Sequence, residues 1–291
     1  MRRYNGFMHQ IFGISHPPLN LERVLRWGIF FGVFLILLTP LVVHNASTFP
    51  SLYPKILYFR VLVEIVFLLY VFLLLVNARR YLPRLSPIFL SLLIFIEILI
   101  LSTWRGLNPE RSFWGTIERG EGLILFLHLF LFFVVLVGVF REKNAWMNIL
   151  RFSVLTSIPL GVTGFAQFFF TETPGYHPAN ATLGNPIFYA VHALIIIFLA
   201  LFLAIHDYQY RSQPMRKEAP KKRAQTVSSI ADIARRKGWM LWGALAVFNL
   251  FMLLLTVSRG AMVGLAVGFV FLLVAWFLFL GRGRNKEGAR R

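Results

Sequence analysis

The chain has 291 residues, of which 57% are apolar and only 14% are charged, whereas charged residues make up about 25% of an average soluble domain. Its 31 phenylalanines are spread through long apolar runs, which argues against a water-soluble fold, because one soluble core could not bury so many large side chains. Lys and Arg outnumber Asp and Glu by 30 to 12, yet they are confined to short gaps between apolar runs, so membrane topology explains them better than a nucleic-acid partner.

Eight apolar stretches are long enough to cross a membrane as helices, since a helix needs about 20 apolar residues to cross a hydrocarbon core about 30 Å thick. After an N-terminal segment over residues 1–25, they lie near 26–44, 56–76, 87–104, 122–140, 149–170, 186–206, 239–257 and 261–281. The sequence therefore predicts an all-α, polytopic transmembrane helix bundle over residues 26–281. Only Ser258, Arg259 and Gly260 separate the last two stretches, so we expect a tight turn there.

The distribution of Lys and Arg predicts which gaps face the cytoplasm, because cytoplasmic loops carry the excess of these residues. In all, 24 of the 30 fall in or beside the N-terminal segment, every second gap and the basic tail 282–291. The longest such gap is the basic loop 207–238, which we interpret as a solvated linker followed by a short amphipathic helix at the membrane surface. We therefore expect both termini in the cytoplasm.

The predicted outer loop between the third and fourth stretches, STWRGLNPERSFWGTIERGEG, is rich in arginine. It contains Arg105, Arg111 and Arg119, balanced by three glutamates and interleaved with aromatic residues. One interpretation is an interfacial loop whose charges pair with one another while its aromatic rings lie at headgroup depth. The other is an anion site, since a guanidinium offers a planar fork of donors that matches phosphate oxygens, and the aromatic rings would suit a sugar or prenyl chain.

Arg259 lies in the turn between the last two stretches, with only Ser258 and Gly260 as companions. A charge at the edge of two spans is costly unless it reaches water, a partner or a ligand. Gly260, with further glycines every four residues, would leave room for a bulky ligand, although small residues at this spacing also mark plain helix packing. Contact of Arg259 with a ligand and a purely structural turn both stay open on these grounds.

The third predicted outer loop, TETPGYHPANATLGNPIFYA, precedes the sixth stretch. Pro186 is typical of a first helical turn and Asn185 of its cap, and Asn185 is also a candidate substrate-binding residue. His177 could act as a base near neutral pH, although a lone loop histidine is more often structural. Within the stretches, six polar residues should face the bundle interior, and their partners stay unassigned: Glu64, Glu97, His128, Gln167, His192 and Asn249.

The chain contains no phosphate-binding GxxxxGK[ST] loop, no HExxH zinc helix and no GxSxG nucleophile elbow. It also has no cysteine, which excludes disulfides, thiol nucleophiles and thiolate metal sites. We therefore expect no metal site and no cofactor, and the sequence argues against an ATP-driven pump acting alone.

Four stretches of the sequence, three of them beside the predicted outer residues, share their order and spacing with a known family. They are SFWGTIERGEGL (112–123), GFAQFFF (164–170), ATLGNPIFYA (181–190) and LLLTVSRGAMVGLAVG (253–268). In these residues, and in the topology of roughly residues 20–281, the chain resembles the O-antigen ligase and O-antigen polymerase superfamily of bacterial inner-membrane proteins.

The resemblance implies a protein that handles a glycan linked to undecaprenyl diphosphate and transfers it, without nucleotide, on the outer face of the inner membrane. The acceptor would be another glycan, lipid A-core or a protein. The resemblance also implies that Arg259 contacts the phosphates of the carrier, that Ser258 and Gly260 complete its motif, and, less directly, that Arg119 and Arg111 take part. In such a transfer the diphosphate leaves with growing negative charge, which arginines in a poorly hydrated pocket stabilise more than they stabilise the ground state.

The family associates deprotonation of the acceptor hydroxyl with a histidine in a large outer loop downstream of the SRG spans. This sequence stops at Arg291 before such a loop, so we expect an N-terminal portion, a truncated gene product or a chain that needs a partner, and no glycan transfer by the chain alone. Transfer by the chain alone would make His177 the candidate base. Two other functions stay open: a transporter or flippase of a lipid-linked or anionic solute, and a non-catalytic assembly protein that docks through the loop 207–238.

Overall fold

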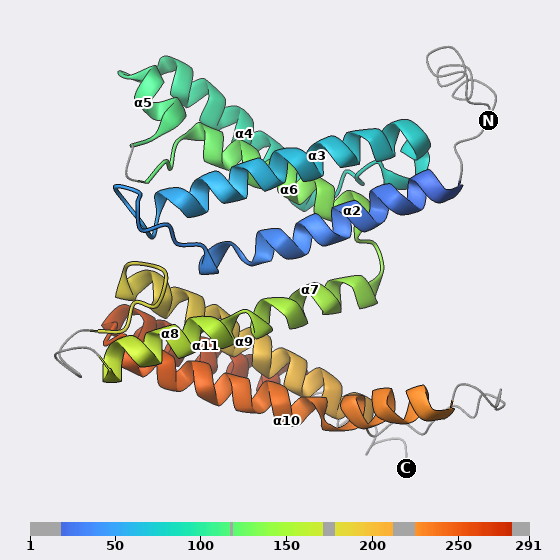
Figure 1. Ribbon diagram of the computed structural model, residues 1–291, viewed down its shortest axis with the longest axis vertical. Coiled ribbons are helices and arrows are strands. Elements are labelled where there is room, and N and C mark those ends of the chain that lie inside the picture. The colour runs from blue at the N-terminus through green and yellow to red at the C-terminus, as the bar shows by residue number, and fades with distance from the viewer. Residues whose placement is uncertain (1–18, 117–118, 171–177, 212–224, 281–291) are drawn as a thin grey trace. The chain divides into compact units, whose positions relative to one another are not determined.

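A computed structural model describes residues 19–116, 119–170, 178–211 and 225–280 of the chain. Every regular element among them is a helix, so the predicted all-α fold class is confirmed for the described residues (Figure 1). The chain divides into two compact units, unit 1 over residues 1–152 and unit 2 over residues 153–291.

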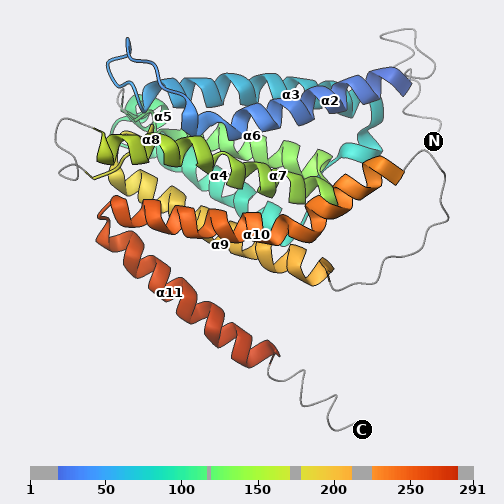
Figure 2. The same cartoon turned by 60° about the horizontal axis from the view of Figure 1, so that its bottom comes forward.

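Unit 1 is built on a helical hairpin against which further helices pack. Its helices are α2 (Leu19–Leu37), α3 (Tyr53–Tyr81), α4 (Pro87–Arg105), the short α5 (Pro109–Trp114), α6 (Leu123–Val139) and most of α7 (Lys143–Leu155). Helices α2 and α3 run side by side in opposite directions, and α6 packs on α3 (Figures 1 and 2). Their core contains Ile29, Val33, Val63, Leu73 and Val135, all 1% exposed or less. At Gly32 a Cβ atom would overlap the side chain of Val66, so the close approach of α2 to α3 requires a glycine there.

Unit 2 is built on a second antiparallel hairpin. Its helices are α8 (Ser157–Phe169), α9 (Pro186–Arg211), α10 (Gln225–Leu255) and α11 (Arg259–Ala275), which is followed by a π-helical turn (Trp276–Leu280). Helices α9 and α10 form the hairpin, α8 packs on α10, and α11 packs on α9 near its own start and then diverges from α10 (Figure 2). Small residues, among them Ala190, Ala193 and Ala261, bring α9 and α11 together.

Among the described residues, six helical segments are long and apolar enough to cross a membrane, one of them formed by α7 and α8 together, which makes the chain a multi-pass membrane protein. They are Tyr53–Tyr81, Pro87–Arg105, Lys143–Phe169, Pro186–Gln209, Gly238–Leu255 and Arg259–Leu278. The remaining two of the eight predicted stretches also hold helices, but α6 has 17 residues and α2 begins in charged sequence.

Three predicted boundaries differ from the structure. The stretch 26–44 ends as an α-helix at Leu37, because Pro40 enforces a short 3-10 turn. The stretch 149–170 is divided at Thr156 into α7 and α8, since Pro159 has no N–H to donate to the carbonyl of Leu155. Residues 226–239, expected as a separate surface helix, are continuous with α10.

Candidate anion-binding site

A turn joins α10 to α11 as predicted, but it lies at residues 256–258 rather than 258–260, and it has an unusual backbone. Val257 adopts a left-handed conformation with φ 54°, which is costly for a β-branched residue. The Thr256 hydroxyl supports the turn, because it donates to the Leu253 carbonyl (2.6 Å) and accepts from the Ser258 N–H (3.3 Å). The chain then starts α11 at Arg259, so Arg259 stands at the N-terminus of that helix.

Arg259 and Gly260 are both exposed at this turn. Arg259 forms no ion pair or side-chain hydrogen bond with any residue in the described part of the chain. The side chain of Ser258 makes no capping hydrogen bond, and no atom lies within 4 Å of the position that a Cβ of Gly260 would take. The turn therefore presents a guanidinium and open backbone N–H groups beside free space.

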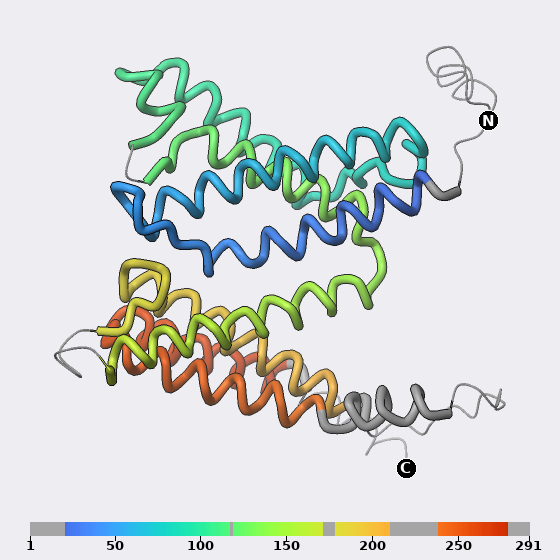
Figure 3. Tube along the Cα trace, viewed as in Figure 1, coloured from blue at the N-terminus to red at the C-terminus, as the bar shows by residue number. Residues whose placement is uncertain are grey.

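The start of α9 lies at the same end of unit 2 as this turn. The Ala179 N–H donates to the carbonyl of Leu255, the last residue of α10, at 3.1 Å. Asn185 caps α9 as predicted, because its side-chain oxygen accepts from the Ile187 N–H at 2.8 Å. The loop before α9 and the turn before α11 occupy one end of unit 2 in both views (Figures 1 and 2), and the tube of Figure 3 traces the same course.

Three buried polar atoms near the start of α9 have no hydrogen-bond partner among the described residues. They are the hydroxyl of Tyr189, the Nε2 of His192 and the Oε1 of Gln167. Tyr189, which is 1% exposed, lies in the first turn of α9 and packs over Gly164 of α8, and Gln167 follows Gly164 by one turn. The amide nitrogen of Gln167 donates to the Ala181 carbonyl at 2.8 Å. Buried polar atoms are nearly always paired, so this group is notable.

The electrostatics of this end favour an anion. Helices α9 and α11 have their N-termini here, with partial positive charge, and α8 and α10 have their C-termini here, with partial negative charge that offsets it, so the net positive charge comes from Arg259. The one acidic side chain that the structure describes in unit 2, Asp207, is engaged elsewhere, because it accepts from the indole of Trp242 at 2.9 Å. The donors of Arg259 suit the oxygens of a phosphate or diphosphate. The candidate base His177 lies outside the described residues.

The other predicted arginines belong to unit 1. Arg105 ends α4, Arg111 lies in α5, and Arg119 follows α5; all three are exposed. Asn108 caps α5 by accepting from the Arg111 N–H at 3.0 Å. The structure thus places these three arginines in unit 1 and the Arg259 turn in unit 2.

Glycines shape the loop that carries Arg119. Gly115 and Gly120 have positive φ values of 81° and 56°, which L side chains rarely adopt. At Gly122 a Cβ would overlap the Phe113 carbonyl and the Gly115 nitrogen, so two backbone segments meet there. The glycines of the SFWGTIERGEGL stretch therefore serve the loop conformation.

Two polar residues of α3, Arg60 and Glu64, secure this part of unit 1. Arg60 donates through Nη2 to the Gly120 carbonyl at 2.6 Å, which ties the loop to α3. Glu64, one turn on, lies 3.0 Å from His128 Nε2. His128 Nδ1 lies 2.7 Å from the Ile124 carbonyl, so His128 joins α3 to its own helix, α6. Charged residues are rare within spans, so the position of Arg60 in the first turns of a predicted span could have marked it as a residue with a partner in the fold.

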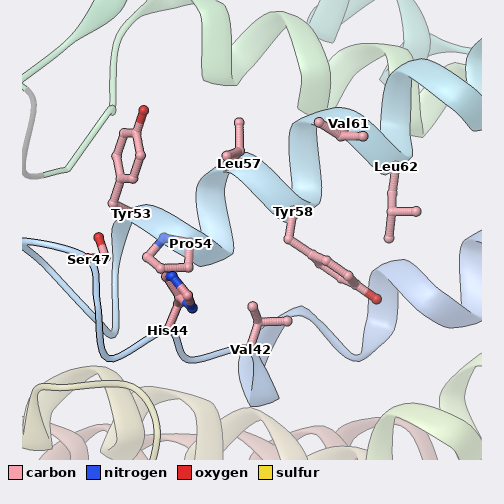
Figure 4. Close-up of a pocket in the computed structure, with 9 residues that line it drawn as sticks. All are labelled: Val42, His44, Ser47, Tyr53, Pro54, Leu57, Tyr58, Val61 and Leu62. Carbon is pink, nitrogen blue, oxygen red and sulfur yellow. The ribbon is translucent and has the colours of Figure 1, made fainter.

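Unit 1 also contains a cavity of about 480 Å³ where the loop after α2 meets the start of α3 (Figure 4). Leu57, Val61 and Leu62 form apolar walls, and His44 and Tyr53 contribute polar groups near the loop. None of the nine residues that line the cavity is an arginine or a lysine. Its chemistry suits an alkyl or prenyl chain better than a phosphate.

Comparison with known proteins gives no match to this chain, whether with protein-family models, curated proteins or solved structures. The resemblance to O-antigen ligases and polymerases therefore stays a prediction from the four stretches. In the structure, ATLGNPIFYA forms the loop and start of α9, and LLLTVSRGAMVGLAVG spans the turn from α10 into α11. These two stretches supply the loop before α9 and the turn before α11 at this end of unit 2.

Proposed function

We propose that the chain is a bacterial cytoplasmic-membrane protein of the O-antigen ligase or polymerase type, which binds an undecaprenyl diphosphate-linked glycan for transfer to an acceptor. The observation that carries the proposal is Arg259. It is exposed at the N-terminus of α11, without an ionic partner among the described residues, at the end of unit 2 where α9 also begins. A diphosphate needs such a concentration of positive charge.

The proposal gives each part of the site a chemical task. Arg259 would form two parallel hydrogen bonds to phosphate oxygens, and the N–H groups at the start of α11 would bind a further oxygen. The bond from the sugar to the diphosphate breaks as the acceptor hydroxyl attacks, so negative charge grows on the diphosphate, where Arg259 lies. The acceptor is another glycan, lipid A-core or a protein, and its hydroxyl needs a base.

The proposed topology has eight spans, with α2 and α6 added to the six apolar helices, and both termini in the cytoplasm. This places the Arg259 turn, Asn185 and the loop of Arg105, Arg111 and Arg119 on the outer face, and the distribution of Lys and Arg supports it. Polyprenyl chains lie within the membrane, so a diphosphate site at span ends lets the carrier stay there while its glycan reaches water.

The test is the affinity of the purified chain in detergent micelles for undecaprenyl diphosphate, compared with undecaprenol. We expect the diphosphate to bind more tightly, Arg259→Lys to weaken it about tenfold because an ammonium loses the planar fork, and Arg259→Gln to weaken it further. Arg79→Lys is the matched control, because Arg79 is an exposed span-end arginine at the predicted cytoplasmic end of α3. Unchanged affinity in both Arg259 variants would overturn the proposal.

A further inference from the structure

One face of α2 changes from charged to aromatic along the helix. Arg23, Arg26 and Trp27 are followed by Phe30, Phe31 and Phe34, a spacing of three and four residues that places all six on one stripe. The stripe lines a cavity of about 540 Å³, which Asn148 of α7 also lines. It is larger than the cavity of Figure 4 and, unlike it, contains cationic side chains.

Aromatic contacts place α7 beside this stripe. The rings of Phe34 and Phe152 meet edge to face with their centroids 4.9 Å apart. On the neighbouring turn, Phe30 meets Phe140 at 4.5 Å in the same manner. The cavity therefore has two walls, from α2 and α7, held in place by ring packing.

The charge in this cavity is uncompensated. Neither Arg23 nor Arg26 forms an ion pair or a hydrogen bond with a residue in the described ranges. Their acidic neighbour Glu22 is engaged by α3, because it accepts from Arg80 at 3.0 Å and from the Tyr81 hydroxyl at 2.6 Å. Two guanidinium groups thus stand at one end of an otherwise aromatic cavity.

The order of side chains along the stripe matches the order of chemical groups in a membrane lipid. The arginines lie at the end of α2 that pairs with the basic end of α3, where a headgroup would be. Trp27, 69% exposed, comes next, at the depth typical of interfacial tryptophans. The three phenylalanines follow toward the middle of α2, at the depth of acyl chains.

We propose that this cavity binds one anionic diacyl phospholipid. Arg23 and Arg26 bind its phosphate through charge-assisted hydrogen bonds, the amide of Asn148 contacts the ester region, and an acyl chain lies along the phenylalanines. A free phosphate would leave the aromatic wall uncovered, and an acidic peptide would bring backbone groups against it without hydrogen-bond partners. The inference is independent of the proposed diphosphate site, which lies in unit 2.

Native mass spectrometry of the full chain in detergent micelles tests this inference, with phosphatidylglycerol, phosphatidylcholine or inorganic phosphate added in turn. We expect one phosphatidylglycerol to be retained in preference to phosphatidylcholine, and the variant Arg23→Gln/Arg26→Gln to bind it at least about tenfold more weakly. The matched control is Arg79→Gln/Arg84→Gln, because both arginines are exposed and neither lines the cavity. Equal losses in the two double variants, equal retention of the two lipids, or displacement by inorganic phosphate would overturn the proposal.

A second measurement locates the lipid while both arginines of the cavity stay unchanged. Phosphatidylglycerol with brominated acyl chains should quench tryptophan fluorescence more than brominated phosphatidylcholine does, because it places bromine near Trp27. We expect Trp27→Phe to remove this excess and Trp104→Phe to leave it, since Trp104 is similarly exposed but lies in the last turn of α4. An excess that survives in Trp27→Phe would contradict the proposed position of the lipid, even if phosphatidylglycerol binds.

Discussion

In unit 1 the described residues with positive φ are the glycines Gly115 and Gly120, whereas in unit 2 two of the three, Ala181 and Val257, carry a Cβ atom. A left-handed conformation costs an L residue about 1–2 kcal/mol, and glycine avoids that cost. Ala181 lies in the loop before α9 and Val257 in the turn before α11, at the end of unit 2 that carries Arg259. Such strain collects where function fixes a backbone, which is consistent with a binding role for that end.

The two units also differ in how many of their buried polar atoms lack a hydrogen-bond partner among the described residues. Six buried side-chain N or O atoms have no hydrogen-bond partner among the described residues, and five of them belong to unit 2. The sixth is Arg60 Nε in unit 1, where the Tyr70 hydroxyl, by contrast, donates to the Tyr81 carbonyl at 2.9 Å. Three of the five atoms in unit 2 lie near the start of α9, where a ligand could supply partners that the described residues do not.

Among substitutions that test this comparison of the two units, the largest loss of stability is expected from Gly122→Ala in unit 1. The new Cβ would overlap the Phe113 carbonyl and the Gly115 nitrogen, which are backbone groups that cannot rotate away. We expect a loss of about 3 kcal/mol, seen as a lower apparent Tm in detergent micelles. The control is Gly260→Ala in unit 2, where no atom lies within 4 Å of the new Cβ. A Tm that falls equally in the two variants would contradict the packing described for both loops.

The positions of the helices could be predicted from the sequence, because a span is a local property of about 20 residues. The cap at Asn185 could be predicted for the same reason, and so could a turn between α10 and α11, although this turn lies at residues 256–258 and not at 258–260. The pairing of Arg60 with Gly120 and of Glu64 with His128 could not, since the partners lie 60 and 64 residues apart and no local pattern relates them. The Tyr189 hydroxyl, which has no hydrogen-bond partner among the described residues, could likewise be recognised only once the residues around it are in place.

A smaller change in stability is expected when a residue with a Cβ atom is replaced by glycine, or glycine by alanine, at a position with positive φ. We expect Val257→Gly to raise stability by about 1 kcal/mol, because it relieves a β-branched residue at φ 54°. We expect Gly120→Ala to lower stability by a similar amount, because it creates the same strain in unit 1 with only ordinary contacts to Arg60 and Ile56. Apparent Tm values in detergent check both. If Val257→Gly destabilises, the side chain of Val257 contributes more than its conformation costs, and the strain argument for unit 2 fails.

The smallest change in stability is expected from removing one tyrosine hydroxyl from each unit. Tyr70→Phe removes a buried hydrogen bond to the Tyr81 carbonyl, which should cost about 1 kcal/mol.

Tyr189→Phe removes a buried hydroxyl without a described partner, so stability should stay unchanged or rise. The two variants make the same chemical change in a buried tyrosine, so their difference in apparent Tm reports the hydrogen bond alone. Binding of undecaprenyl diphosphate adds a second measurement. If the Tyr189 hydroxyl is kept free for the ligand, Tyr189→Phe weakens binding while it leaves the Tm unchanged, whereas Tyr70→Phe lowers the Tm and leaves binding intact. Equal losses of stability in the two variants would show that the Tyr189 hydroxyl is paired within the fold, and unit 2 would then keep one fewer group free for an anion.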